Sequence, residues 1–247
     1  MRCAILPAAL AALAACGQAE PSQAETTDPV ETQAPPRSTG EALLTKYTWP
    51  GAGDDRAATG EWAPRNECGA IEGAYDFRIA LADAVVARDE DALVALFDPD
   101  VLLDFGGGSG TTTLRERLID PPYNLWLELD EILPLGCAPM DGGGFTLPWL
   151  WGNVSDVDDP FTVMFVIGGD VPAFEKADEE STKLGNLSWD MVEMVDWSDG
   201  EFSHIKLSDG REAYVANHAL RSAVDYRLLA ERGENGKFRI TTFVAGD

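Results

Sequence analysis

The sequence predicts an α+β protein: an N-terminal helical α+β domain, a small β domain, and a C-terminal hairpin that packs on the first domain. Three observations support this class. Apolar residues recur at helical spacing between residues 71 and 135. Residues 202–207 alternate in polarity as a half-buried strand does. Asn235-Gly236 separates two strand-like runs, which is typical of a β-hairpin.

The first sixteen residues have the composition of an export signal. Arg2 gives a positive start, and Ala4–Ala15 is an apolar run that is too short to span a bilayer. The motif Leu13-Ala14-Ala15-Cys16 resembles the lipobox of bacterial lipoproteins, in which the cysteine is lipidated after cleavage. The alternatives are an ordinary signal peptide with an unrelated cysteine, or a buried core segment. We expect a lipid anchor on Cys16 and a periplasmic location, at the outer membrane because Gly17 rather than aspartate follows.

Two cysteines, Cys68 and Cys137, remain after the signal segment and Cys16 are set aside. An even number in an oxidising compartment predicts one disulfide, which would stabilise the fold by about 4 kcal/mol because it closes a long loop. The alternative is a pair of inert buried thiols. Neither cysteine has a nearby Cys or His companion, so we expect no metal site there.

The charge balance narrows the partners and the chemistry. The chain has 18 Lys and Arg against 43 Asp and Glu, a net charge of −25, which opposes binding to nucleic acid or to anionic headgroups. Its two histidines, His204 and His218, lie near no nucleophile-elbow motif, so a catalytic triad is not expected. We therefore predict a protein that is not an enzyme and uses no cofactor or metal.

Residues 17–63 are expected to form a flexible tether. Residues 17–40 contain few large apolar side chains and cannot bury enough surface to offset chain entropy. Residues 41–63 are intermediate, because Leu44, Tyr47 and Trp62 could pack on the folded body.

The N-terminal domain is expected over residues 64–164. Periodicity and breakers predict helices at 71–87, 92–97, from Thr111–Thr113 onward, and 124–135, with a strand at 101–105.

The stretch "LLDFGGGSGTTTLRERL", residues 102–118, has the order of a phosphate-binding loop: a strand, a glycine-rich turn and a helix. It lacks both the third glycine of a dinucleotide fingerprint, where Thr111 stands, and the lysine of a P-loop. We therefore interpret it as a joint between strand and helix. Its amides remain free to bind a carboxylate of the protein itself.

Two segments resemble nuclear-transport-factor-like (SnoaL-like) cone domains. They are "ALADAVVARDEDALVALFDPDVLLDF", from residue 80, and the closing "GKFRITTFV". The resemblance implies an α+β cone whose pocket binds a small molecule or performs catalysis, with Asp104 as the base. The residues expected to line that pocket are Phe77, Leu81, Trp126 and Phe243.

Residues 165–223 resemble a bacterial SH3-like barrel. The matching pieces are Asp170-Val171, Leu184–Leu187, Gly200–Phe202, Asp209-Gly210 and Ala213–Val215. The resemblance implies a module that binds a protein segment or a cell-wall component. The aromatic residues expected to contact the ligand are Phe174, Trp189, Phe202 and Tyr214.

Residues 224–247 form the expected C-terminal hairpin, which would complete the sheet of the first domain because a hairpin alone is only marginally stable. The sequence thus predicts an envelope lipoprotein with a non-catalytic SH3-like module, whose partner is peptidoglycan or an envelope protein. The alternative is a small-molecule-binding or enzymatic cone domain. A deep pocket with a buried carboxylate of raised pKa would favour the alternative, and a filled core with an exposed aromatic groove would favour the binding module.

Overall fold

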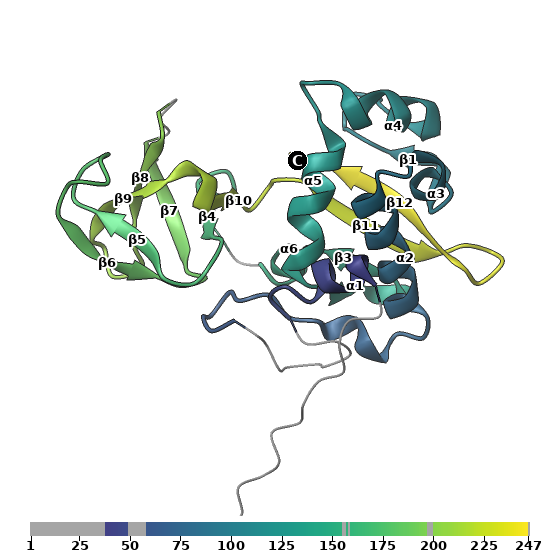
Figure 1. Ribbon diagram of the computed structural model, residues 1–247, viewed down its shortest axis with the longest axis horizontal. Helices are drawn as coiled ribbons and strands as arrows, with labels where there is room; N and C mark the ends of the chain where they lie inside the picture. Colours follow the sequence, from purple (N-terminus) through teal and green to yellow (C-terminus); the bar gives the residue numbers. More distant parts are fainter. Residues whose placement is uncertain (1–37, 49–57, 155–156, 158, 197–199, 247) are drawn as a thin grey trace, which may run out of the picture. The chain divides into compact units, whose positions relative to one another are not determined.

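The computed structural model describes residues 38–48, 58–154, 157, 159–196 and 200–246, all within one compact unit. The expected signal peptide at 1–16, the expected lipidation site Cys16 and residues 17–37 of the expected tether lie outside the described residues. The described part is a mixed α+β structure with two sheets (Figure 1).

The first sheet has five strands in the order β1-β12-β11-β3-β2. β1 pairs in parallel with β12, and the other pairs are antiparallel. The strands are β1 (Phe97–Leu102), β2 (Ala138–Pro139), β3 (Phe145–Leu147), β11 (Arg227–Arg232) and β12 (Phe238–Val244). The C-terminal hairpin β11–β12 therefore lies between strands of the N-terminal region.

Helices pack on this sheet because their apolar faces need a partner surface. α2 (Ala74–Ala87) and α5 (Leu125–Ile132) lie beside β11 and β12 in Figure 1. Leu81 and Val85 of α2 and Leu129 of α5 are fully buried in one cluster with the apolar residues of the hairpin. Burial of such side chains contributes about 2 kcal/mol each. This cluster is the main hydrophobic core.

The region between α2 and the glycine-rich loop differs from the expected element bounds. The short helix expected at 92–97 is α3 (Glu90–Val94), which begins earlier because the side chain of Asp89 accepts a hydrogen bond from the amide of Ala92. The strand expected at 101–105 is β1, which starts at Phe97 and contains Pro99. Pro99 is tolerated within β1 because β1 is an edge strand of the sheet.

The bounds of the next helices also differ from the expected bounds by a few residues. α4 (Gly110–Ile119) is preceded by Ser109 as its N-cap, so the cap expected at Thr111–Thr113 lies two to four residues too late. α5 continues into a short 3-10 turn at Leu133–Leu135. α6 (Trp149–Asn153) follows β3 and covers β2 and β3 on the chain's way to the second sheet.

The last strand carries a β-bulge that re-aims its side chains. In the pairing with β11, Thr242 is opposite Leu229 and Ile240 is opposite Ala230, so Thr241 is the extra residue. The bulge shifts the alternation by one position. Ile240 and Phe243 can therefore both face the core, although they are three positions apart in the strand.

The second sheet has seven antiparallel strands in the order β10-β4-β7-β8-β9-β5-β6. The described strands do not close into a barrel, because β10 and β6 are the two ends of this order. The strands are β4 (Val163–Val166), β5 (Val171–Phe174), β6 (Lys183–Leu187), β7 (Met191–Asp196), β8 (Phe202–Lys206), β9 (Glu212–Ala216) and β10 (Leu220–Ser222).

The expected alternation in β8 agrees with its burial. Ser203 and Ile205 are fully buried, whereas His204 and Lys206 point to the other face. The turn that follows has Gly210 at φ 84°, a conformation that favours glycine. β4 crosses the expected boundary at residue 164, so the second sheet begins at Val163.

Part of the expected tether is folded. α1 (Thr39–Leu44) is capped by the hydroxyl of Ser38, and Leu44 is buried in the main core. The amide of Gly40 donates to Asp83 of α2 over 2.9 Å. The described residues 38–48 and 58–63 therefore pack on the folded body, because their few apolar side chains, such as Leu44 and Ala63, find buried partners.

Cys68 and Cys137 lie at disulfide distance, with their Cα atoms 5.8 Å apart. The pair connects the 3-10 turn Glu67–Ala70 to the segment that enters β2, and the amide of Glu67 donates to the carbonyl of Cys137. Buried Arg78 donates to the side chain of Asn66 over 2.6 Å beside this junction, and burial lowers the pKa of Arg78 to about 10.

Candidate functional site

Three of the four predicted ligand contacts share one face of the second sheet. Phe174 in β5 is directly opposite Tyr214 in β9, and Tyr214 is opposite His204 in β8. Phe202 lies two residues before His204 in the same strand and points to the same face. We call Phe174, Phe202, His204 and Tyr214 the aromatic face.

The rings of the aromatic face are in contact in two pairs. Phe174 and Phe202 meet edge to face, with ring centroids 5.9 Å apart. His204 and Tyr214 are stacked, 4.8 Å apart and nearly parallel. Such pairs contribute about 1 kcal/mol beyond the area they bury.

Exposure differs between the two pairs. Phe174 and Phe202 are only 7% and 6% exposed, whereas His204 and Tyr214 are half-buried. The accessible part of the face is therefore the His204–Tyr214 stack, supported from the side by the two phenylalanines. Polar contacts border it: Glu212 lies 3.0 Å from the His204 ring nitrogen, and Lys206 forms an ion pair with Glu193 at 2.9 Å.

Trp189 is not part of this face, contrary to the sequence prediction. It is 1% exposed and packs in a separate cluster with Ala63 and Leu135. Its ring meets Tyr47 edge to face at 4.9 Å, and its carbonyl accepts from the amide of Trp62. A side chain with these partners is enclosed by the protein itself and offers no surface to a ligand.

The residues expected to line the pocket of a cone domain belong to the main hydrophobic core or pack against it. Leu81 and Phe243 are fully buried in the main cluster, and Phe77 contacts the rings of Phe145 and Phe238. Trp126 packs against the same cluster and lies under the guanidinium of Arg88 at 5.3 Å. The structure therefore brings Phe77, Leu81 and Phe243 together as a filled interior.

The carboxylate of Asp104 accepts hydrogen bonds from the glycine-rich loop. Its Oδ1 accepts from the amides of Gly106 at 2.7 Å and Gly108 at 2.8 Å, and its Oδ2 pairs with Arg117. The Gly108 amide first, and then the Arg117 guanidinium, lower the pKa of Asp104. A base needs the opposite shift, so the role expected for Asp104 in the alternative does not fit. The loop instead holds a carboxylate of the protein itself.

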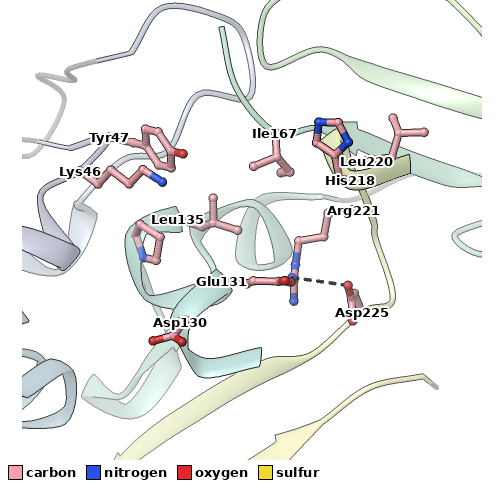
Figure 2. Close-up of a pocket in the computed structure, with 11 residues that line it drawn as sticks. Lys46, Tyr47, Asp130, Glu131, Leu135, Ile167, His218, Leu220, Arg221 and Asp225 are labelled. Carbon is pink, nitrogen blue, oxygen red and sulfur yellow. Dashed lines mark hydrogen bonds and ion pairs between the residues drawn. The ribbon is translucent and has the colours of Figure 1, made fainter. Parts of the chain in front are cut away.

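A cleft of about 260 Å³ lies where the residues after α1, the end of α5 and β10 come together (Figure 2). Figure 2 shows Lys46 and Tyr47 on one side and His218, Leu220 and Arg221 on the other. The remaining lining residues are Asp130, Glu131, Pro134, Leu135, Ile167 and Asp225.

Arg221 organises the acidic side of the cleft. It is 5% exposed, and its Nη1 lies 3.3 Å from Glu131 and 3.5 Å from Asp225. Its Nη2 donates to the carbonyl of Tyr226 over 3.0 Å. One guanidinium thus serves two carboxylates, and both of these ion pairs are long.

Glu128, one turn before Glu131 on α5, has a raised pKa in these surroundings. Burial, and then the negative charge of Asp225, raise the pKa of Glu128 to about 7, although Arg221 opposes the shift. Burial and the charge of Glu128 in turn raise the pKa of neighbouring Tyr226 to about 12. At Glu128, burial and the charges of Asp225 and Glu131 outweigh the opposing charge of Arg221.

Sequence reasoning did not identify the cleft, because its residues come from distant segments with no shared motif. The only local signal is the spacing of Glu128 and Glu131, which places both on one face of a helix. Asp130 is paired with Arg88 at the surface and contributes little negative charge to the cleft.

No protein-family model, curated protein or solved structure matches the chain. Within the described residues, no helix is both long enough and apolar enough to cross a membrane. The same residues contain no group of three or more His, Cys, Asp or Glu side chains that could hold a metal ion.

Proposed function

We propose that the protein is a membrane-anchored envelope lipoprotein, lipidated at Cys16, whose second sheet is a non-catalytic, SH3-like binding module. Its partner would be peptidoglycan or an envelope protein. The observation that carries the proposal is the aromatic face, where the His204–Tyr214 stack is accessible. The core beneath the sheet is separately filled by residues such as Ile205 and Val215. A ring stack on a rigid sheet offers apolar area and polar ring atoms at a low cost in conformational entropy.

The surroundings of the stack fit a ligand with both apolar and polar groups. Lys206, Glu193 and Glu212 border the rings with charges of both signs, so a sugar, an amide or a peptide backbone would find donors and acceptors there. The SH3-like interpretation adds the expectation that an extended ligand follows the strands. A closed barrel is not required for this, because β5, β8 and β9 alone carry the aromatic face.

The cone-domain alternative has less support. It needs a pocket at Phe77, Leu81 and Phe243, which are packed together, and a base at Asp104, whose pKa is lowered rather than raised.

A pull-down tests the proposed function. The full-length chain, held in detergent so that membrane association does not retain it, is mixed with isolated peptidoglycan or with an envelope extract. We expect retention on one of the two, and about a tenfold loss of retention for Tyr214→Ala, because a central aromatic anchor is removed.

Phe161→Ala is the matched control, since Phe161 is a 60% exposed aromatic residue outside the aromatic face. Retention that is equal in Tyr214→Ala and Phe161→Ala, or absent from the wild-type chain on both materials, would contradict the proposal.

A further inference from the structure

The cleft beside α5 has a positively charged side chain at one end and a negatively charged one at the other. Each of these two side chains can still form an ion pair with a ligand. On one side, Lys46 makes no ion pair with any described residue, and its ammonium lies over the ring of Tyr47 at 4.8 Å. Facing it from α5, Glu131 uses one oxygen for the long contact to Arg221, and its side chain is about half exposed. The second oxygen of Glu131 has no partner among the described residues.

The walls between these ends are apolar. Leu135, Ile167 and Leu220 line the cleft together with Pro134, and Figure 2 shows Leu135 and Ile167 between the two sides. A ligand that fits must therefore have a short apolar body with an anionic group at one end and a cationic group at the other. The volume of about 260 Å³ is at the small end of ligand sites, which limits the ligand to one or two amino-acid residues.

We propose that this cleft binds a short zwitterionic peptide, of the size of a dipeptide, through its two termini. The peptide carboxylate pairs with Lys46, and its ammonium group pairs with Glu131. Its side chains contact Leu135 and Leu220.

The electrostatics of the surroundings support this orientation. Asp225, Glu131 and Glu128 share Arg221 as their cationic neighbour, so an incoming ammonium group relieves repulsion at that end. The carboxylate end lies away from these acids, beside Lys46. Charge-assisted hydrogen bonds at both ends would fix the direction of the peptide.

The cleft is a second site, apart from the aromatic face, and the proposal does not depend on the function proposed for that face. Two sources could supply the same chemistry: L-peptides from proteins and D-peptides from the cell wall. Alanyl-alanine probes of the two chiralities separate these sources.

Isothermal titration of the full-length chain in detergent tests the proposal. The probes are L-alanyl-L-alanine and D-alanyl-D-alanine, each also as the N-acetyl and the C-amide derivative. We expect one chirality or both to bind saturably, and capping either end to weaken binding about tenfold because one ion pair is lost. Absence of binding by both free dipeptides, or equal binding of the capped derivatives, would overturn the proposal.

Two variants assign the ends. Lys46→Met should weaken binding of the free dipeptide about tenfold but should leave binding of the C-amide derivative unchanged, because that derivative already lacks the carboxylate. Glu131→Gln should likewise weaken binding of the free dipeptide about tenfold but should leave binding of the N-acetyl derivative unchanged, because that derivative already lacks the ammonium group. Lys237→Met and Glu116→Gln, at exposed positions away from the cleft, are the matched controls. Variants that bind like their controls would overturn the assignment of the termini.

Tyr214→Ala distinguishes this proposal from the proposed function. It should retain wild-type dipeptide affinity even where it loses retention on envelope material. Loss of dipeptide binding in Tyr214→Ala at unchanged stability would show that the cleft is not an independent site.

Discussion

Two carboxylates in the N-terminal region, Asp104 and Glu128, have opposite environments. Asp104 accepts two backbone amides and pairs with Arg117, and its pKa is lowered. Glu128 is half-buried beside Asp225 and Glu131, and its pKa is raised to about 7. In a chain with a net charge of −25, cations are too few to neutralise every acid. Their placement therefore separates the sites that hold the fold together from those that remain open to an outside cation.

The difference also explains why the two sites suit different tasks. The glycine-rich loop satisfies its carboxylate completely with the protein's own donors, which fixes the joint between β1 and α4. The corner between α5 and β10 satisfies its carboxylates only in part, because Arg221 is shared. A partly satisfied polar cluster is costly for stability and is often functional.

The largest effect is expected from Arg221→Met. The substitution leaves the carbonyl of Tyr226 without its donor and removes the single cation between Glu131 and Asp225. We expect a loss of about 3 kcal/mol in the free energy of unfolding, measured by urea titration with tryptophan fluorescence. The loss should be larger at pH 8 than at pH 5, because Glu128, whose pKa is raised to about 7, is more fully ionised at pH 8 and loses its attraction to Arg221 in the variant.

Arg211→Met is the control, since Arg211 forms an exposed pair with Asp209 and should change the stability by less than about 0.5 kcal/mol. Equal losses in the two variants would show that Arg221 does not organise this corner.

A smaller effect is expected in the satisfied region from Gly108→Ala. An added Cβ would meet both Asp104 Oδ2 and Arg117 Nη2 and would force their ion pair apart. We expect a loss of about 2 kcal/mol in the free energy of unfolding. Gly185→Ala, where an added Cβ meets nothing within 4 Å, should have little effect and serves as the control. If Gly108→Ala keeps wild-type stability, the loop is not a close-fitting joint.

The sequence predicted features that depend on local chemistry. The hairpin turn at Asn235-Gly236 and the alternation in β8 follow from turn residues and periodicity. Periodicity also predicts the helix at 71–87, which in the structure begins three residues later as Ala74–Ala87. The role of the glycine-rich loop as a joint between strand and helix could also be predicted, because the loop lacks the residues that bind phosphate. Its ligand, Asp104, was not identified because a short loop can fold back on any nearby carboxylate.

What the sequence could not predict depends on contacts between distant segments. Trp189 lies in the bend between β6 and β7, and its packing against Tyr47, more than a hundred residues earlier, helps to remove it from the surface. The cleft joins residues near 46, 131 and 221 in the same way. Pro99 within β1 follows from the position of that strand at the sheet edge, which local sequence does not encode.

The smallest effect, and the most direct test of the comparison, is expected from Glu128→Gln. Because the folded-state pKa of Glu128 is about 7 and its ordinary value is 4.5, ionising it costs stability that grows between pH 4.5 and pH 7 and is constant above. The uncharged glutamine avoids this cost. We therefore expect the variant to match the wild type at pH 4 and to exceed it by about 1 kcal/mol at pH 8, a value reduced for the partial exposure of the side chain.

The measurement is urea unfolding at pH 4, 6 and 8, with Glu116→Gln on exposed α4 as the control that should show no such pH dependence. A variant that is less stable than the wild type at pH 8 would mean that Glu128 gains more from Arg221 than it loses to burial and to Asp225. The corner would then be as well satisfied as the loop around Asp104, and the contrast between the two carboxylates would not hold.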